Sequence, residues 1–361
     1  MKRHRVLVTI GVLALTFLSA QIAGVAEAVW FGDPNLEYVI RDVLDSWLGA
    51  IDDTELLTIK TIVAAEKGIR NLSGLEHCVN ATFLDLSYNA LTDIAPIASL
   101  SALSFLSVYE NQIVDISPLA SLAELGVVWL DFNEIDDISA LAHLTKLVGV
   151  YLKSNLISDI SVLAAIPEIR ILDLTNNAIG DVSPLAGLTK IERLRLFGNS
   201  ISDLTPLATL TSVFELTLGT LGVEPAPVDL TPIWGMERLS RLLISSIELP
   251  SLEPLRRLGY LTELNVLRAG LTDIAAVSAM TKLRLLGLSG NPIEDISPLL
   301  DMPSLEIVWL LDTGVTRNDG SPAAAVIAAL EAEGVTVILS EDESEGLELG
   351  PLVPGGRKYA P

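Results

Sequence analysis

The 361-residue sequence has little of what catalytic and metal sites need. It holds one cysteine, Cys78, and three histidines, His4, His77 and His143. A single cysteine excludes an intrachain disulfide, and no histidine stands at the spacing of a zinc site. The sequence also lacks a phosphate-binding loop, a dinucleotide fingerprint and a nucleophile elbow. We therefore expect no catalytic residues, no cofactor and no metal site.

Basic residues are also scarce. The chain has 23 Lys and Arg against 46 Asp and Glu, which gives a formal net charge of -23 at neutral pH. A surface of that sign repels nucleic acid and anionic membranes, so neither is expected as a partner. It keeps a long apolar-rich chain soluble and favours basic partners.

Three of the few basic residues, Lys2, Arg3 and Arg5, stand at the amino end before an apolar run from Val6 to about Ala20. Ala26-Glu27-Ala28 then fits the small-x-small rule for cleavage, so residues 1–28 are predicted to be a secretory signal peptide. The alternative is an uncleaved anchor, but the run is short for a membrane span of about 20 residues. After cleavage no membrane span is expected.

What the sequence has in abundance is periodicity. Asparagine recurs every 22 residues at positions 89, 111, 133, 155, 177 and 199, and again at 291, inside a frame such as Leu84-x-Leu86-x-x-Asn89. This frame at this period is typical of leucine-rich repeats. We predict an α/β repeat solenoid, with parallel strands on the concave face and short 3-10 or helical turns on the convex face. Residues 59–319 would hold about eleven clear repeats and one degenerate repeat.

Three repeat positions have structural explanations. The asparagine is expected to form a ladder that pairs buried backbone groups between successive turns. An aspartate four residues later, as at Asp115 and Asp137, is interpreted as an Asx-type turn cap rather than a calcium ligand, because calcium needs six to eight converging oxygens. The serine or threonine that often follows before a proline, as in Ser117-Pro118, is read as a helix N-cap.

The repeat pattern is irregular in one place. Leu221, Ile247 and Ala269 replace the asparagine in three successive repeats, and about four residues are inserted near 224–227. Either the sequence has drifted there, or the curvature changes or a bulge is used in binding.

The two ends of the array need covers. Residues 29–58 are predicted to form an N-terminal helical cap that starts at Asp33-Pro34, presents one apolar face from Leu36 to Leu48 and ends at Gly49. Residues 320–339 are predicted to form a C-terminal cap, with a helix from Pro322 and a last strand before Ser340. Residues 340–361 are predicted to be a disordered acidic tail.

Function is expected on the concave face, at the positions two, four and six residues before the asparagine column. Seven aromatics occupy them, more than 18 aromatics spread at random would place there: Phe83, Phe105, Tyr109, Trp129, Tyr151, Phe197 and Trp309. Six of these lie between Phe83 and Phe197, and polar side chains stand beside them at Asp85, Asp131, Lys153, Asp173, Arg193 and Arg195. Except for Asp85 and Trp309, these residues form the predicted partner-binding site. The alternative is that aromatics simply favour strands.

The block at 68–78, GlyIleArgAsnLeuSerGlyLeuGluHisCys, resembles the internalin-like class of bacterial leucine-rich-repeat proteins, as do the stretches 83–89, 115–119 and 33–36. The resemblance covers about residues 30–340. It implies a right-handed curved solenoid, secretion and protein recognition on the concave face. No immunoglobulin-like domain, sorting signal or wall-binding module is recognised, so a host-adhesion role is not carried over. We expect a secreted, periplasmic or cell-surface module that binds a protein. The alternative is carbohydrate binding on the same aromatic face.

Export makes a direct prediction. The exported protein should begin at Val29, because the signal peptidase would cut after Ala28. N-terminal sequencing of protein recovered outside the cytoplasm checks this, and a chain that still begins at Met1 would favour the anchor.

Overall fold

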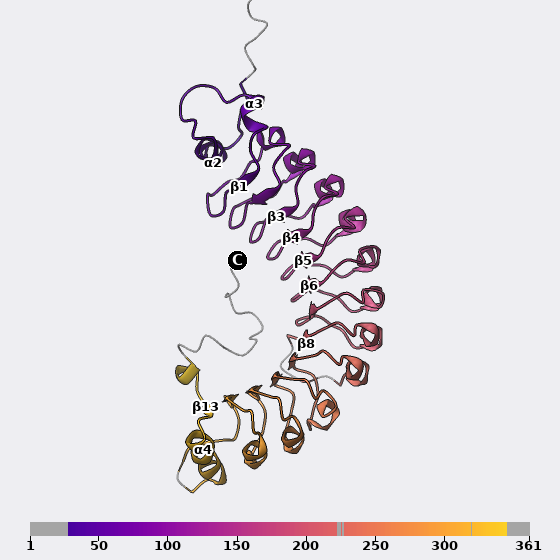
Figure 1. Cartoon of the computed structure of the whole chain (residues 1–361), viewed down its shortest axis with the longest axis vertical. Helices are drawn as coiled ribbons and strands as arrows, with labels where there is room; N and C mark the ends of the chain where they lie inside the picture. The colour runs from indigo at the N-terminus through magenta and orange to yellow at the C-terminus, as the bar shows by residue number, and fades with distance from the viewer. Residues whose placement is uncertain (1–27, 222–224, 226, 319, 345–361) are drawn as a thin grey trace, which may run out of the picture.

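The described strands of the protein all belong to one open parallel sheet. The computed structural model describes residues 28–221, 225, 227–318 and 320–344. Within them, thirteen strands pair in sequence order along a curved array (Figure 1). The strands are β1 Thr61–Val63, β2 Phe83–Asp85, β3 Phe105–Ser107, β4 Val127–Trp129, β5 Gly149–Tyr151, β6 Ile171–Asp173, β7 Arg193–Arg195, β8 Glu215–Gly219, β9 Arg241–Ser245, β10 Glu263–Leu267, β11 Leu285–Gly287, β12 Ile307–Trp309 and β13 Thr336–Ile338. The predicted solenoid is confirmed.

A short 3-10 turn follows each of β1 to β11 and lies on the convex side of the array (Figure 1). These turns are η1 Leu75–His77, η2 Ala95–Ser99, η3 Ser117–Ser121, η4 Ser139–His143, η5 Ser161–Ala165, η6 Ser183–Leu185, η7 Thr205–Thr209, η8 Thr231–Gly235, η9 Glu253–Leu255, η10 Ala275–Ala279 and η11 Ser297–Asp301. In most repeats an aspartate caps the turn, as Asp115 does where its Oδ1 accepts the N–H of Ser117 at 2.7 Å. Ser117 is the first residue of its turn and Ile116 occupies the N-cap position, so the prediction that Ser117 is the N-cap is wrong.

The core is a continuous stack of leucine and isoleucine side chains between the sheet and the turns. Leu84, Leu86 and Leu174 are fully buried, and the same columns are filled in every repeat. Cys78 takes a core leucine position and is also buried, and burial raises the pKa of its thiol to about 12. Each turn of the array thus buries its apolar side chains mainly against the turns next to it.

The asparagine ladder is present as predicted. Asn133 Oδ1 accepts the N–H of Ile113 in the preceding turn at 3.0 Å. Its Nδ2 donates to the carbonyls of Val108 at 3.0 Å and Leu130 at 3.1 Å. One side chain therefore pairs backbone groups of two successive turns that water cannot reach.

The residue just before the asparagine has a left-handed backbone, which the sequence did not reveal. Tyr88, Glu110, Phe132, Ser154 and Asn176 have φ between 52° and 55°. A non-glycine residue in this region costs roughly 1–2 kcal/mol, so the repeated turn imposes it. The turn also brings the side chains of Tyr88 and Phe132 to the rim of the concave face.

The three successive repeats in which Leu221, Ile247 and Ala269 replace the asparagine have longer strands. β8, β9 and β10 have five residues each, while the other strands of the described sheet have three. Leu218 pairs with Ile244, and Ile244 pairs with Val266, so strand pairing continues toward the point where the asparagine would otherwise act. The missing asparagine is therefore matched by a local change of backbone structure. The inserted segment 224–227 lies partly outside the described residues.

The N-terminal helix is shorter than predicted. α2, Pro34–Leu44, begins at the N-cap Asp33, which also accepts the N–H of Arg70 and so ties the helix to the first repeat. It ends at Asp45, whose φ is 49°, and not at Gly49. The Arg41 guanidinium donates to the carbonyls of Ser46 and Gly49, which holds the chain away from the helix axis. Trp47 and Leu48 consequently lie beyond the helix and are exposed.

A one-turn helix, α3 Asp53–Leu56, follows with a complete capping box. At the other end α4, Pro322–Ala332, begins at Ser321, whose Oγ accepts the N–H of Ala324 at 3.1 Å. η12, Asp342–Ser344, is the last described element. The predicted signal peptide, apart from its last residue, and residues 345–361 of the predicted tail lie outside the described residues.

Replacement of Asn133 by alanine should lower the free energy of unfolding by about 2–4 kcal/mol, because it leaves several buried backbone groups without partners. Urea denaturation followed by circular dichroism measures this. Asn318→Ala, at an exposed site, is the control and should stay within about 0.5 kcal/mol of wild type. A loss for Asn133→Ala no larger than that of the control would show that the ladder contributes nothing.

Candidate binding surface

One row of aromatic rings crosses β2 to β5 on the concave face. The rings of Phe83 and Phe105 stack in parallel with centroids 4.4 Å apart, in register across β2 and β3. Phe105 contacts Trp129 at 6.4 Å, and Trp129 contacts Tyr151 at 5.0 Å. The last distance agrees with the expectation that residues in one column lie about one strand spacing apart.

A second row runs along the rim beside the first. The Tyr88 and Tyr109 centroids are 5.0 Å apart, and Tyr109 meets Phe132 edge-on at 5.3 Å. The ammonium group of Lys153 lies 5.1 Å from the Phe132 centroid and ends the row. Burial, with help from the neighbouring Tyr88 hydroxyl, raises the pKa of Tyr109, so this phenol stays protonated.

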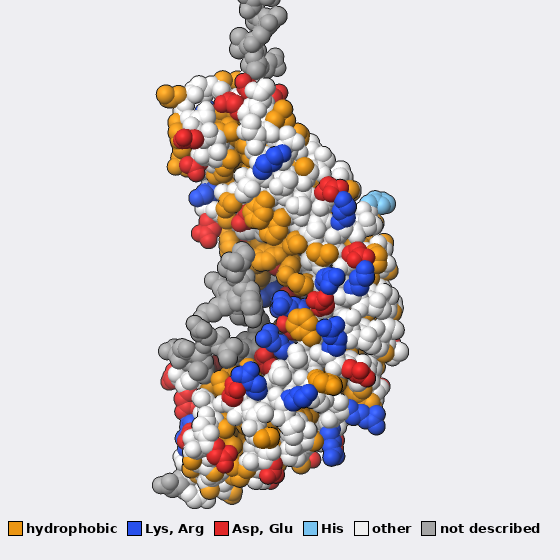
Figure 2. All heavy atoms as spheres, viewed as in Figure 1, with side chains coloured by type: hydrophobic (Ala, Val, Ile, Leu, Met, Phe, Trp, Pro, Cys, Tyr) orange, Lys and Arg blue, Asp and Glu red, His pale blue; other side chains and the backbone are white. Residues whose placement is uncertain are grey.

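We call these seven residues the aromatic platform: Phe83, Tyr88, Phe105, Tyr109, Trp129, Phe132 and Tyr151. Each keeps part of its side chain exposed, and Tyr88 is 39 % exposed. Apolar side chains gather on the concave side of the upper repeats, with charged side chains below them (Figure 2). Aromatic rings that already contact one another lose little conformational entropy when a partner covers them, which suits a binding surface.

From β6 onward the concave face carries paired charged side chains in place of the aromatic rings. Arg195 donates to Glu215 at 2.6 Å and lies 3.3 Å from Asp173. Glu215, only 2 % exposed, also lies near the guanidinium groups of Arg193 and Arg241. Burial lowers the pKa of Arg195, but the charges and hydrogen bonds of Glu215 and Asp173 outweigh it, so the net shift is upward.

The network continues to β10, where Arg241 pairs with Glu263 at 3.5 Å. Burial raises the pKa of Glu263, and the positive charge of Arg241 opposes this shift. The sequence reasoning named Arg193 and Arg195 but missed Glu215, Arg241 and Glu263. The sequence pattern could have identified these three residues, because Glu215, Arg241 and Glu263 occupy the same register position as Arg193.

Four predicted surface residues are less accessible than alternation suggested. Phe197 is 6 % exposed and Trp309 is 2 % exposed, so the prediction that both are exposed is wrong. Asp131 and Asp173 are buried as well. Alternation along a strand fixes which side of the sheet a side chain leaves, but neighbouring strands about 4.8 Å away decide how much of it they cover.

Asp131 is held inside the structure by the backbone. Its Oδ1 accepts the N–H of Lys153 at 2.6 Å, while the Lys153 ammonium group turns to Phe132. Burial raises the pKa of Asp131 well above its ordinary range, and the negative charge of Asp173 adds to the shift. Asp131 therefore positions the strand end and is not a free group for a ligand.

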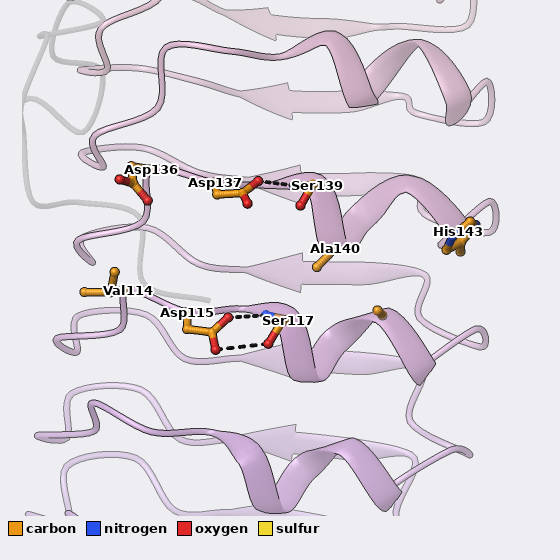
Figure 3. Close-up of a pocket in the computed structure, with 9 residues that line it drawn as sticks. Val114, Asp115, Ser117, Asp136, Asp137, Ser139, Ala140 and His143 are labelled. Atoms are coloured by element: carbon orange, nitrogen blue, oxygen red, sulfur yellow. Dashed lines mark hydrogen bonds between the residues drawn. The ribbon is translucent and has the colours of Figure 1, made fainter.

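The convex side has a hollow of about 420 Å³ between η3 and η4, lined by Val114, Asp115, Ser117, Ala120, Asp136, Asp137, Ser139, Ala140 and His143 (Figure 3). Two of its three carboxylates cap the turns: Asp115 accepts the N–H of Ser117 and Asp137 accepts the N–H of Ser139, and the first bond lowers the pKa of Asp115. His143 lies at the far end, away from them (Figure 3). Among the described residues, no three His, Cys, Asp or Glu side chains gather in a way that could hold a metal ion.

The repeat family agrees with this architecture. The profile for leucine-rich repeats (2 copies) matches residues 167–209. An internalin of Listeria monocytogenes, InlF, is 34% identical over 86% of this chain and 90% of its own, with a TM-score of 0.76. This chain belongs to the internalin-like family of leucine-rich-repeat proteins. Leucine-rich-repeat proteins of this type are protein-interaction modules, and the fold is typically a non-enzymatic scaffold.

Two further structures extend the comparison. Internalin C2 of the same bacterium is 29% identical over 59% of this internalin-like chain and 94% of its own, with a TM-score of 0.56. A plant peptide hormone receptor, RGFR1 in complex with RGF2, shares the fold at 18% identity and a TM-score of 0.50, over 73% of this chain and 50% of its own. No curated protein matches the sequence. None of the described helices has the length and apolar character that crossing a bilayer requires.

The raised pKa of Asp131 predicts a pH effect on stability. The folded state binds this proton more tightly than the unfolded state, so the carboxyl group lowers stability as pH rises from about 4 to its folded pKa. In Asp131→Asn, which keeps the acceptor for Lys153, this part of the decline should vanish. Urea unfolding from pH 4 to 8 measures the difference, and parallel pH curves for the two proteins would contradict the assignment.

Proposed function

We propose that this internalin-like protein is an exported module that binds a partner protein through the aromatic platform on β2 to β5. The observation that carries the proposal is the two rows of partly exposed rings in mutual contact. Exposed aromatic clusters of this kind mark recognition sites, because they give large contact area at small entropic cost. Lys153, Arg193 and Arg195 lie at the lower border of the platform and would set specificity there.

Export rests on the features of residues 1–28 and on membership of the internalin-like family. The compartment would be the secreted, periplasmic or cell-surface space. The strong negative charge of the chain fits a protein that remains in solution and does not bind nucleic acid.

The platform favours a protein over a carbohydrate. Sugar binding would need planar polar groups free beside the rings. Asp131 is bound to the Lys153 backbone and Asp173 is paired with Arg195, so neither carboxylate is free. A partner that presents apolar side chains makes better use of Phe83, Phe105 and Trp129. The plant receptor of the same fold is a peptide hormone receptor, which accords with a peptide or protein partner.

Truncation of the platform tests the proposal. Trp129→Ala and Tyr151→Ala should each weaken binding of the partner by about thirtyfold, which corresponds to about 2 kcal/mol. The partner is recovered by pull-down from the native culture, and its affinity for each variant is measured by titration. Folding should persist, because both rings lie outside the leucine core, and thermal melting checks this.

His143→Ala, in the convex hollow, is the control and should bind as wild type does. A glycan array is run in parallel with the same proteins. If both aromatic variants keep partner affinity within twofold of wild type, the platform is not the site. If an array glycan binds and its binding depends on Trp129, the carbohydrate alternative replaces the protein one.

A further inference from the structure

A ladder of opposite charges runs along one flank of the array, three residues before each strand. Lys146 pairs with Glu124 of the preceding turn at 2.6 Å, and Lys190 pairs with Glu168 at 2.6 Å. The parallel register keeps these positions in one column from turn to turn. In this part of the flank, each cation has a carboxylate one turn away.

The ladder breaks at β9 to β11. The same column there holds Arg238, Tyr260 and Lys282, and the positions on either side of them are Ser212 and Ser304. No carboxylate remains in the column for the two cations. Arg257, three residues before Tyr260 in the sequence, is a third exposed cation. Within the described part of the chain, neither an ion pair nor a hydrogen bond from the side chains of these three residues is found.

Aromatic rings contact two of the three cations, Lys282 and Arg257. Lys282 Nζ lies 4.0 Å from the centroid of Tyr260, a residue that is 58 % exposed. The Arg257 guanidinium lies 5.1 Å from the centroid of Trp234. Such contacts orient a cation without neutralising it. We call Trp234, Arg238, Arg257, Tyr260 and Lys282 the flank cluster.

Neighbouring charges do not cancel the cluster. Arg256 is paired with Glu253 at 3.3 Å, so this carboxylate is already engaged. Glu237 is exposed beside Arg238 in sequence, but no ion pair joins them. Several Lys and Arg side chains are visible in the lower half of Figure 2. Arg238, Arg257 and Lys282 thus keep their positive charge uncompensated in a chain that has twice as many acidic as basic residues.

We propose that the flank cluster binds an acidic segment of a partner protein, whose carboxylates pair with these cations as Glu124 and Glu168 pair with Lys146 and Lys190 elsewhere in the column. The intact part of the ladder shows the chemistry that these cations accept, because its lysines bind carboxylates in the same column. Planar guanidinium groups at Arg238 and Arg257 suit carboxylates in particular. This surface is separate from the aromatic platform, so the proposal does not depend on the function assigned to that platform.

The probe is a fluorescein-labelled peptide of about ten glutamates, with a glutamine peptide of the same length as its neutral counterpart. Binding is followed by fluorescence anisotropy at about 0.15 M salt, where a Debye length of about 8 Å screens the distant acidic residues of the chain. The glutamate peptide should bind wild type and dissociate as salt rises toward about 0.5 M. The glutamine peptide should not bind.

The test variant is Arg238→Gln with Lys282→Gln, and the matched control is Lys146→Gln with Lys190→Gln. Both double variants remove two positive charges from the same column, but only the control removes cations that are already paired. The test variant should bind the peptide about tenfold more weakly, and the control should stay within about twofold. Thermal melting confirms that both remain folded. Trp129→Ala should bind the peptide as wild type does.

Three results would overturn the proposal. The first is that wild type does not bind the glutamate peptide at all. The second is that both double variants lose binding equally, which would mean that net charge and not the cluster attracts the peptide. The third is that wild type binds heparin but not the glutamate peptide, which would make the ligand an anionic polysaccharide instead of a protein segment.

Discussion

The structure depends on how each turn pairs the backbone N–H and C=O groups that it buries. In most repeats an asparagine side chain does this, as Asn133 does for Ile113, Val108 and Leu130. In the three successive repeats where Leu221, Ile247 and Ala269 replace the asparagine, the strands lengthen to five residues, so backbone pairing extends in its place. In the repeats that have the asparagine, the residue before it adopts a left-handed backbone, whatever its side chain. Because these requirements recur every 22 residues, they keep each column of side chains in register along the whole array.

The period of the sequence was enough to predict the strands, the leucine core, the asparagine ladder and the caps of the 3-10 turns, because each of these depends on residues at fixed offsets. Features decided by longer contacts were not predictable in this way. α2 ends at Asp45 because Arg41 binds the carbonyls of Ser46 and Gly49, and no local pattern signals that. Phe197 and Trp309 occupy positions that alternation assigns to the open face, yet neighbouring residues cover them. The left-handed residues Tyr88, Glu110 and Ser154 share no chemical type, so the sequence alone gave no sign of them.

The concave face combines two surfaces with different energetics. The rings of the aromatic platform are already in contact and expose apolar area, so covering them releases water at small entropic cost. The network around Arg195 and Glu215 is nearly closed to solvent, and its charges satisfy one another. Removing one member of such a buried network is costly, whereas the intact network adds little affinity for a partner. The proposed partner would therefore gain most of its binding energy over β2 to β5, and the charged strands from β6 onward would limit where it can bind.

The cations of the concave face and of the flank differ in whether carboxylates of the array neutralise them. On the concave face Arg193, Arg195 and Arg241 have carboxylates on neighbouring strands, so their positive charge is balanced within the array. On the flank the balance holds at Lys146 and Lys190 and fails at Arg238 and Lys282, although all four side chains stand three residues before a strand. The repeat therefore supplies a regular frame, and single substitutions in one column decide whether a cation is neutralised internally or left for a partner. Since concave and flank positions leave each turn in different directions, a ligand on one surface leaves the other accessible.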